Sequence, residues 1–573
     1  MKILFTKKRE IWPAFLLAAA AGLLLFPASV PAQESPTPPS GASADVIESR
    51  TREEARKHFE GVSGEKTAEI EEKLPDPGPA RAVSFQLNKI TFEDDAPEGL
   101  PVPVSYYEDY LGKTITFRQL QEIMRRMEIY YRSKGYIALV YLVPQEIKDG
   151  EVRLGIILSR MGKLTFEGVR YSSKFRLKSY WWQKKGEPLR YDEIRQSLVR
   201  MSDYPDRSVK SILKAGEEKG TTDVIVKVDD RFPIHAGASL DNQGVKSVGK
   251  ERPGFWIKHN NFLRLDDRFM IGTVFGRTFG SLYLNHLIPL THFGTRFTWG
   301  FSHTQVTPHK EFKILGINGT AETYTLGLRQ KLFESSKLLL DSYLGIDFKE
   351  KRTRQQSVTT VRDRLRVLSW GVDMQTFGEN GFWSLGQNFS LGLPLVGDGH
   401  PLTSRGAESS FFKISGDIRR TQKLPLGLKG TISGGYQLSP DKLVPAEQVF
   451  LGGASSVRGY PESDYGADQS VYGSMEIQVP AYFFPKEWTV PFTESKWRDV
   501  VHGVGFVDYG YGRLRDPSST ERRSRNMLSV GGGFIIRLFK NLFARFEWGV
   551  PLGDSALTEG GNSQFHFRLQ LEV

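Results

Sequence analysis

The segment QFHFRLQLEV, residues 564–573, alternates strictly between apolar and polar side chains. Its apolar positions are Phe565, Phe567, Leu569, Leu571 and Val573. A β-strand directs successive side chains to opposite faces, so these five lie on one face and the polar residues lie on the other. The segment therefore predicts a strand that separates an apolar environment from a polar one.

The same alternation occurs elsewhere in the C-terminal part of the chain. Leu542–Val550 carries Arg545 and Glu547 on its polar face, and Val471–Val479 repeats the pattern. A soluble sandwich can show this pattern too, but the sorting must be strict in a transmembrane barrel, because a charge facing lipid at the midplane costs about 2–4 kcal/mol. We therefore expect residues 232–573 to form a transmembrane antiparallel β-barrel. At roughly 20 residues per strand and connection, this region has room for about sixteen strands.

The first 32 residues have the parts of a secretory signal peptide. Basic residues at positions 7–9 precede an apolar run from Phe15 to Phe26, and small residues end the segment at Ala32. The apolar run is too short to span about 30 Å of hydrocarbon as a helix. We expect residues 1–32 to be cleaved rather than retained as a membrane anchor.

Residues 33–83 change character along their length. A Pro/Ser-rich linker at 33–44 precedes a charged, helix-prone stretch at 45–73. The segment LPDPGPA at 74–80 then breaks any helix. Because residues 45–73 contain few large apolar side chains, one interpretation is a solvated, mobile arm.

Residues 84–160 and 161–231 look like two copies of one small α/β domain. ITFED at position 90 and LTFEG at position 164 open the copies with an alternating strand. In the first copy, Thr116 and Gln119 form a capping-box pair that begins a helix, and Gly135 suits the left-handed position where it ends. Apolar residues at helical spacing predict its buried face: Leu120, Ile123, Met124, Met127, Tyr130 and Tyr131.

Composition narrows the possible functions. The chain has no cysteine, which excludes disulfides and thiolate metal sites, and its formal net charge is +11. Its basic residues are scattered rather than interleaved with aromatics, so we expect no nucleic-acid partner. The ten histidines form no His-x-x-x-His or His-Glu-x-x-His pair, and there is no Gly-x-Ser-x-Gly elbow. We expect no enzymatic activity, no metal site and no cofactor.

The turn-rich segment EQVFLGGASSVRGYPESDYG, residues 447–466, carries one cation, Arg458, among glycines and serines. It lacks the strand–loop–helix context of a nucleotide-binding loop. A guanidinium can bind a carboxylate with two parallel hydrogen bonds, and flanking glycines permit a sharp turn. The residues alone leave two interpretations open: a loop paired with a carboxylate inside the barrel, or an exposed hairpin with an unpaired arginine.

Four stretches resemble the two-partner secretion transporters, outer-membrane proteins that combine POTRA (polypeptide-transport-associated) domains with a barrel. YYRSKGYIALVYLVPQEIKDGEVRLGIIL (130–158) resembles the first POTRA domain, and SLDNQGVKSVGKERPGFWIKHNNFLRLDDRF (239–269) resembles the first barrel hairpin. LVPAEQVFLGGASSVRGYPESDYGADQSVYGSMEIQVP (443–480) resembles the signature loop, and GFVDYGYGRL (505–514) resembles a late Phe-x-Asp strand. The motif positions in the first POTRA domain are Gly135, Tyr136, Pro144, Gln145 and Gly150. The resemblance is less close at Val573, where many such barrels end in an aromatic residue.

The resemblance implies a role for the signature loop, residues 447–470. Its tip, Val457, Arg458, Gly459 and Tyr460, is expected to fold back into the barrel lumen. There Arg458 is expected to pair with Asp508, with Phe506 packing on the guanidinium and Glu476 as a less favoured alternative partner. In relatives an N-terminal helix also lies in the pore, and residues 45–73 are the candidate for such a plug.

The resemblance further implies a function and a location. The POTRA domains would lie in the periplasm of a Gram-negative-type bacterium, bind a large unfolded exoprotein and pass it through the outer-membrane barrel without ATP. The other expected partners are outer-membrane lipid and the barrel assembly machinery, and the transporter is expected to be a monomer. Two alternatives remain: a factor that inserts other barrels, for which two POTRA domains are few, and a passive porin, for which they are superfluous.

Overall fold

The computed structural model describes residues 40–60, 69–72, 84–93, 101–218, 220–335, 337–394, 403–539, 541–557 and 563–573. The predicted signal peptide, residues 1–32, and the first part of the linker lie outside the described residues. Among the described helices, none combines the length and the apolar character needed to cross a membrane.

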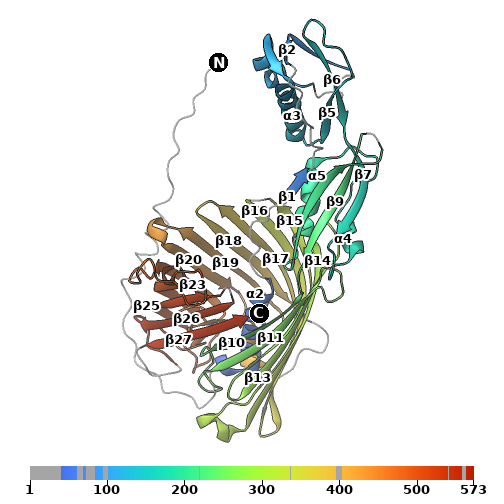
Figure 1. The fold of residues 1–573 in the computed structure, drawn as a ribbon. Helices are drawn as coiled ribbons and strands as arrows, with labels where there is room; N and C mark the ends of the chain where they lie inside the picture. The colour runs from blue at the N-terminus through green and yellow to red at the C-terminus, as the bar shows by residue number, and fades with distance from the viewer. Residues whose placement is uncertain are drawn as a thin grey trace, which may run out of the picture. The chain divides into compact units, whose positions relative to one another are not determined.

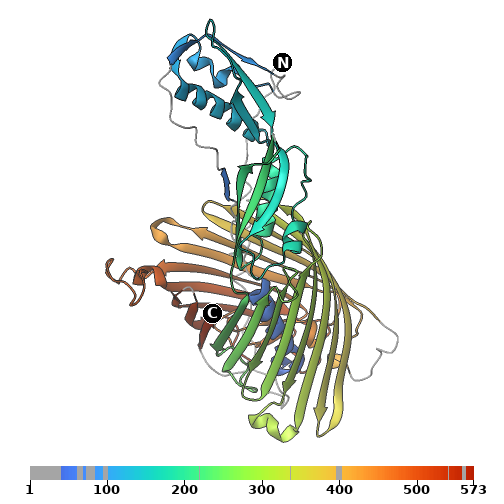
Figure 2. The same ribbon diagram turned by 45° about the vertical axis from the view of Figure 1, so that its right-hand side comes forward.

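The C-terminal part of the chain is a closed antiparallel barrel of sixteen strands (Figures 1 and 2), which confirms the predicted fold class. The first and last strands close the barrel, with Gly237 opposite Glu572 and Asp241 opposite Arg568. The strands are β10 (Ile234–Asp241), β11 (Arg252–Asn260), β12 (Arg268–Phe275), β13 (Phe279–Pro289), β14 (Thr295–Val306), β15 (Ile317–Glu334), β16 (Leu338–Gln355), β17 (Val358–Gly378), β18 (Gly381–Gly392), β19 (Phe411–Lys423), β20 (Lys429–Leu438), β23 (Gln469–Pro480), β24 (Val501–Arg513), β25 (Ser524–Leu538), β26 (Leu542–Pro551) and β27 (Gln564–Glu572).

The alternation seen in the sequence sorts side chains between the two faces of the wall. In β27, Phe565 and Leu571 are each 46 % exposed on the outer face, whereas His566 between them is buried inside. β17 has 21 residues, about twice the 9–11 that span a bilayer, so the barrel wall extends well beyond the hydrocarbon layer at this strand.

The first α/β domain packs one helix against a small sheet. Strands β3 (Lys89–Phe92), β6 (Glu151–Leu158) and β5 (Ala138–Leu142) form the sheet in that order, while β2 (Ser84–Leu87) pairs with β4 (Lys113–Thr116). Helix α3 (Phe117–Ser133) begins with the predicted capping box of Thr116 and Gln119. Gly135, just beyond its end, has a φ of 84°, as the helix-stop pattern predicted. The domain also contains the short helices η2 (Val104–Tyr106) and η3 (Glu108–Tyr110).

The second α/β domain contains an element that was not expected. Strands β7 (Arg160–Glu167), β9 (Thr221–Asp230) and β8 (Arg207–Ala215) pack with helices α4 (Lys174–Ser179) and α5 (Tyr191–Met201). A short strand from the linker, β1 (Glu69–Glu72), pairs in parallel with β8 at the edge of this sheet. The stretch 45–73 is therefore not one helix.

Two segments that are not wall strands lie within the barrel. Helix α2 (Ala44–Glu60), preceded by η1 (Ser40–Ala42), packs against β12, β13, β14 and β15, and is the blue helix in Figures 1 and 2. The second segment is the signature loop, which follows η7 (Pro445–Glu447) and contains β21 (Val449–Leu451) and β22 (Tyr465–Ala467). The remaining short helices are η4 (Lys310–Leu315), η5 (Ser404–Gly406), η6 (Pro425–Gly427) and α6 (Trp497–Val500).

Candidate functional site in the barrel lumen

The signature loop is a two-stranded ribbon that folds against the inner wall of the barrel. β21 pairs with β22, with Val449 opposite Ala467 and Leu451 opposite Tyr465. The ribbon places the tip residues between these strands against β24, β25 and β26. The arrangement matches the lumen interpretation of the sequence rather than the exposed hairpin.

Glycines on both sides allow the tip to touch the wall. A Cβ at Gly459 would lie 2.6 Å from Ser529 Cβ and 2.7 Å from Pro551 N. A Cβ at Gly549, on β26, would lie 2.5 Å from the carbonyl oxygen of Arg458. A side chain at either position would push the loop away from the wall, because such distances are far below van der Waals contact.

The structure brings Arg458 and Asp508 together in a two-pronged ion pair. Nε of Arg458 donates to Oδ2 of Asp508 at 2.8 Å, and Nη2 donates to Oδ1 at 2.7 Å. The backbone N–H of Arg458 donates to the same Oδ2 at 3.0 Å. Since both side chains are at most 5 % exposed, the pair is shielded from water and depends on its mutual hydrogen bonds.

Every N–H of the Arg458 guanidinium has an acceptor. Besides the two bonds to Asp508, Nη1 donates to Glu476 at 2.9 Å and to Glu547 at 2.5 Å, and Nη2 donates to Ser474 at 2.8 Å. A guanidinium has five such donors in a fixed plane, so this cage accepts an arginine and leaves no equivalent place for lysine. The ring of Phe506 lies 3.4 Å from the guanidinium carbon and covers its face.

A second arginine balances part of the negative charge at the tip. Nη2 of Arg545 donates to Glu476 at 2.5 Å and to Glu547 at 2.6 Å. The cluster thus holds two arginines against three carboxylates, Asp508 among them. Removal of Arg458 would leave the carboxylates facing one another with a single counter-charge.

The other two tip residues, Val457 and Tyr460, are wholly buried beside this cluster. They pack with Leu451 and Met527 in a small apolar core between the ribbon and the wall. The hydroxyl of Tyr460 accepts from the backbone N–H of Gly553 at 3.2 Å. The tip is therefore held by apolar burial as well as by charge.

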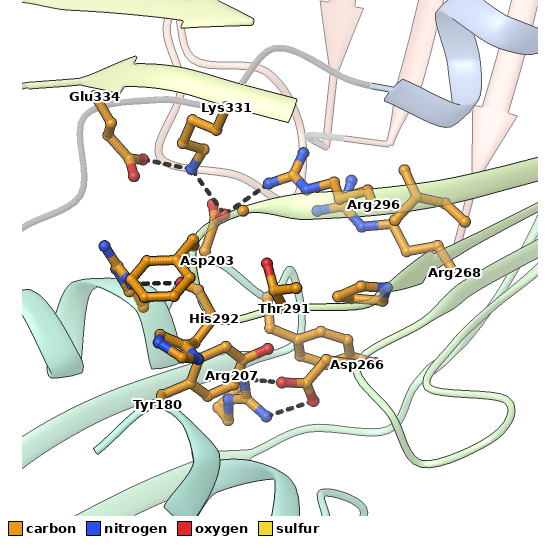
Figure 3. A pocket seen from close by; sticks show the side chains of 16 residues that line it. Tyr180, Asp203, Arg207, Asp266, Arg268, Thr291, His292, Arg296, Lys331 and Glu334 are labelled. Carbon is orange, nitrogen blue, oxygen red and sulfur yellow. Dashed lines mark hydrogen bonds and ion pairs between the residues drawn. The ribbon is translucent and has the colours of Figure 1, made fainter. Parts of the chain in front are cut away.

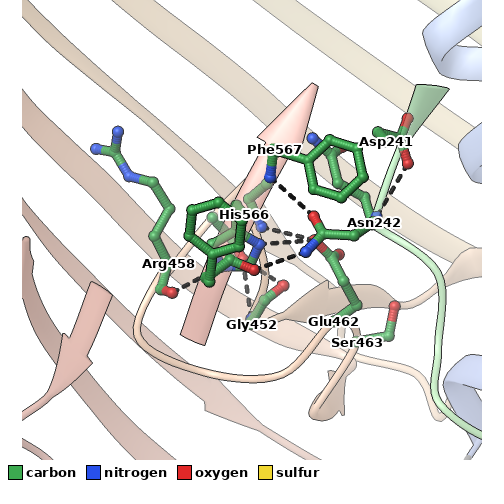
Figure 4. Close-up of polar contacts among 12 residues, drawn as sticks. Asp241, Asn242, Gly452, Arg458, Glu462, Ser463, His566 and Phe567 are labelled. Atoms are coloured by element: carbon green, nitrogen blue, oxygen red, sulfur yellow. Dashed lines mark hydrogen bonds and ion pairs between the residues drawn. The ribbon is translucent and has the colours of Figure 1, made fainter. Parts of the chain in front are cut away.

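The seam between the first and last strands contacts the same tip (Figure 4). The side chain of Asn242 donates to the carbonyl of Phe565 at 2.7 Å and accepts from the N–H of Phe567 at 2.9 Å. These side-chain bonds extend the β10–β27 ladder past Asp241, together with the backbone N–H of Asn242, which donates to the carbonyl of Phe567 at 3.4 Å. Nε2 of His566, on β27, donates to the carbonyl of Arg458 at 2.8 Å.

Sequence reasoning missed Glu547, Arg545 and His566 as members of the site. Each had been placed on the polar face of its strand, which is the signal that was available. The alternation does not show which polar residues of β26 and β27 lie level with Asp508, because that depends on the register of the strands across β25.

Helix α2 is held in the lumen mainly by ion pairs. Arg52 contacts Asp347 on β16 at 3.0 Å, and Glu54 accepts from Arg252 on β11 at 3.1 Å. Nearer the start of the helix, Asp45 lies 3.0 Å from Lys351 on β16.

The helix also contacts the signature loop directly. Arg50 donates to Glu462 at 2.7 Å and to the hydroxyl of Ser463 at 3.1 Å. Apolar contact with the wall is limited to small patches, such as Ile47 beside Val306 and Ala55 beside Trp256, Met270 and Tyr283. Helix α2 and the signature loop therefore contact each other beside the loop tip, at Glu462 and Ser463.

In the first α/β domain, Gly135 and Tyr136 lie at the junction with the second domain. The N–H of Tyr191, at the start of α5, donates to the carbonyl of Gly135 at 2.9 Å. The guanidinium of Arg190 lies 4.9 Å from the centre of the Tyr136 ring. These two motif positions therefore contact the next domain.

The remaining motif positions lie in the hairpin that joins β5 and β6. The side chain of Gln145 donates to the carbonyl of Arg153 at 2.6 Å and accepts from its N–H at 2.8 Å, which continues the ladder past the end of β5. Pro144 is exposed, and Gly150 has a φ of 72° at the turn before β6. The five motif positions therefore lie in two separate regions. Gly135 and Tyr136 contact the second domain, whereas the other three belong to the β5–β6 hairpin.

Comparison with known proteins agrees with this architecture. The haemolysin secretion/activation protein ShlB/FhaC/HecB family matches residues 220–532, and the ShlB-type POTRA domain matches residues 85–158. The chain is 23 % identical over 449 residues to the heme/hemopexin transporter protein HuxB of Haemophilus influenzae, covering 74 % of this chain and 76 % of that protein.

Among solved structures, CdiB from Escherichia coli superposes with a TM-score of 0.62 at 18 % identity, covering 92 % of this chain and 98 % of that one. BamA from Haemophilus ducreyi lacking POTRA domains 1–3 superposes with a TM-score of 0.57 at 15 % identity, covering 85 % of this chain and all of that one. The fold is thus shared with both, although identities this low show the fold alone.

Proposed function

This chain belongs to the haemolysin secretion/activation protein ShlB/FhaC/HecB family, and on that premise we propose that α2 and the signature loop keep its export pore closed at rest. The chain is an outer-membrane protein translocator with POTRA domains on the periplasmic side of a sixteen-stranded barrel. Its cargo is a large exoprotein, which enters unfolded from the periplasm and folds outside the cell.

The observation that carries the proposal is the filled lumen. α2 contacts β11, β14 and β16 of the wall through charged side chains, and the loop tip contacts β23, β24 and β26. We infer that an extended polypeptide passes only after one of these segments has moved. We therefore assign to α2 the part of a plug that leaves and to the Arg458 clamp the part of a fixed brace.

The sheet edges of the POTRA domains support a route for recognising cargo. An unfolded chain can add a strand to an exposed edge, with main-chain hydrogen bonds supplying affinity. In the first domain, the outward N–H of Val140 on the edge strand β5 donates to the carboxylate of Glu128 at 3.2 Å. In the second domain, the β8 edge carries β1 of the chain itself. A cargo strand would displace the Glu128 side chain from β5 in the first domain, and strand β1 from β8 in the second.

Membership of this family also suggests the remaining partners, outer-membrane lipid and the barrel assembly machinery. Apolar side chains such as Phe255, Leu326 and Trp548 are about half exposed on wall strands, and we assign them to contact with outer-membrane lipid. The barrel assembly machinery would insert the chain, and one chain with a closed barrel is a complete pore, which favours a monomer.

Comparison of secreted proteins tests the proposal. Four strains would be compared at matched barrel levels: intact protein, deletion, Arg458→Ala, and Arg354→Ala, whose side chain is exposed at the end of β16. We expect one large protein to disappear from the medium or cell surface in the deletion strain and in Arg458→Ala, and to persist in Arg354→Ala.

Two other outcomes would change the assignment. A joint fall of many outer-membrane barrels in the deletion strain would show that the chain inserts other barrels, as its structural likeness to BamA would then imply. Normal secretion by Arg458→Ala at matched levels would remove the clamp from the export mechanism and leave the exporter assignment intact.

A further inference from the structure

A cavity lies where the second POTRA domain meets the periplasmic ends of β12, β13, β14 and β15 (Figure 3). Its volume is about 70 Å³, several times the space that one water needs. Tyr204 of the POTRA domain is part of its lining. Arg207 reaches it from the same domain, and Arg268 and Arg296 reach it from the barrel. The pore-closing elements do not contribute to its lining.

The acidic residues of the lining are already occupied. Asp266 accepts two bonds from Arg207, both at 2.8 Å. Asp203 lies 2.9 Å from Arg296 and 3.4 Å from Lys331. These carboxylates therefore have little capacity left for other cations in the cavity.

Donors of the same lining remain unused. Within the part of the chain that the structure describes, the Arg268 side chain has no hydrogen bond or ion pair; the nearby charge of Arg296 repels it, and the carboxylates of Asp203 and Asp206 attract it from beyond ion-pair distance. The hydroxyl of Tyr204, a residue only 5 % exposed, also lacks a partner. Arg200 donates to a backbone carbonyl, that of His292, and its guanidinium stacks on Trp182.

The unused donors and the excess of positive charge in the lining suit an anion that offers several acceptor oxygens. A phosphate group offers several oxygens, binds guanidinium through charge-assisted hydrogen bonds and accepts from a phenol. We propose that this cavity binds the phosphate of an anionic phospholipid headgroup from the periplasmic leaflet of the outer membrane. The phosphate would bond to Arg268 and Tyr204 and so join the POTRA domain to the barrel rim.

The surroundings favour a lipid phosphate over a free one. The β13–β14 turn that borders the cavity exposes Leu290 by 52 % and Phe293 by 65 %, and Phe333 at the end of β15 is 51 % exposed. Large apolar side chains at the rim of a membrane barrel suit the acyl region next to a headgroup. A soluble phosphate would gain nothing from them.

Native mass spectrometry of the full chain in detergent tests the site. The protein would be offered phosphatidylglycerol, the matching diacylglycerol without phosphate, or inorganic phosphate alone. We expect wild type to retain phosphatidylglycerol and Arg268→Met to retain at least about tenfold less, which is the effect of losing one charge-assisted bond. Arg268→Lys should recover part of the binding, and Arg264→Met, which removes an exposed charge from the adjacent β11–β12 turn, should behave as wild type.

A second variant tests the unused hydroxyl by the sign of its effect. In lipid-free detergent, Tyr204→Phe should keep or raise the melting temperature, because it removes a buried donor that has no acceptor. With phosphatidylglycerol present, it should gain a smaller upward shift than wild type. A variant that merely folds poorly would have a lower melting temperature in lipid-free detergent, so it cannot satisfy the first expectation.

Three results would overturn the proposal. Equal retention by wild type and Arg268→Met would show that the cavity does not hold the phosphate. Equal retention of diacylglycerol would mean that only apolar contacts bind lipid here. Stabilisation by inorganic phosphate as large as that by phosphatidylglycerol would make the ligand a soluble anion.

Discussion

The loop tip and helix α2 both lie in the lumen and both use arginine–carboxylate pairs, yet they are held in different ways. The Arg458–Asp508 pair is at most 5 % exposed and every guanidinium donor is used. The Arg52–Asp347 pair of α2 is 26 % and 19 % exposed, and both carboxylate oxygens of the buried Asp45 lack a hydrogen bond despite the nearby Lys351.

This difference separates a fixed element from a releasable one. Opening a desolvated, fully bonded pair leaves charges buried without partners, whereas parting a pair that is about a quarter exposed, as Arg52–Asp347 is, lets water replace the lost contact. Among the described residues, the buried apolar side chains of α2 are few and mostly small: Ala44, Val46, Ile47 and Ala55. Four experiments would break or sharpen this contrast, and they follow from the largest expected effect to the smallest.

Arg458→Ala should destabilise the barrel by about 3–5 kcal/mol, because Asp508, Glu476 and Glu547 would then share a buried site with one arginine. Urea unfolding followed by heat-modifiable gel mobility measures the loss. Arg545→Ala serves as the control. Arg545 is 25 % exposed, so its loss should cost about 1 kcal/mol. Equal costs for the two variants would show that Arg458 is no better shielded from water than the partly exposed Arg545 of the wall.

Gly549→Ala should cost about 1–3 kcal/mol and loosen the loop, because its Cβ would lie 2.5 Å from the Arg458 carbonyl. Gly503→Ala on β24 is the matched control, since the nearest atom to its added Cβ is 3.8 Å away. Protease sensitivity of the loop and unfolding in urea would be compared. A tolerant Gly549→Ala would mean that the tip shifts freely along the wall.

Arg52→Ala should change barrel stability by only about 0–1 kcal/mol while it raises the open time of the pore. The same release should appear in wild type at high salt, because screening weakens partly exposed pairs such as Arg52–Asp347. Single-channel recording in a planar bilayer measures both, with deletion of residues 44–60 as the fully open reference. Unchanged conductance after the deletion would show that α2 does not close the pore.

Proline in β1 should cost at most about 1 kcal/mol for the lost edge bond and should leave both the barrel and its pore unchanged. Ile70→Pro and Glu71→Pro are tested separately, because successive amides of a strand point to opposite sides and one of them faces β8. Amide hydrogen exchange at Ser211–Leu213 should become faster in one of the two proline variants and should stay unchanged in the control, Glu71→Ala. Unchanged exchange in both proline variants would show that β1 does not protect this edge.

The barrel and the first helix were predictable because their signals are local. The period-two alternation in 564–573 indicates a strand facing two environments, and the strand count follows from the length of such sequence. Likewise, the capping pair Thr116–Gln119 and the turn at Gly135 act within a few residues of α3. No distant contact is needed for either prediction.

The linker was harder because its structure depends on surfaces elsewhere in the chain. The stretch 45–73 is charged and helix-prone, yet the helix ends at Glu60 and residues 69–72 form a strand on β8. Residues 40–44, expected to be linker, include the buried Ala42 and Ala44 against the barrel wall. The conformation of such a short charged segment depends on the sheet edge or cavity that it contacts. The sequence of the segment itself does not specify that contact.

By itself, the sequence determined that this chain has a wall of alternating strands, two small α/β domains and an arginine-bearing loop suited to a carboxylate. It did so because residue spacing and side-chain chemistry are properties of the chain alone. Only the tertiary structure decided that Glu476 and Glu547 join Asp508 around Arg458, that α2 meets the loop through Arg50, and that Arg268 and Tyr204 share a cavity. These contacts depend on strand register and on closure of the barrel, which bring together residues far apart in sequence.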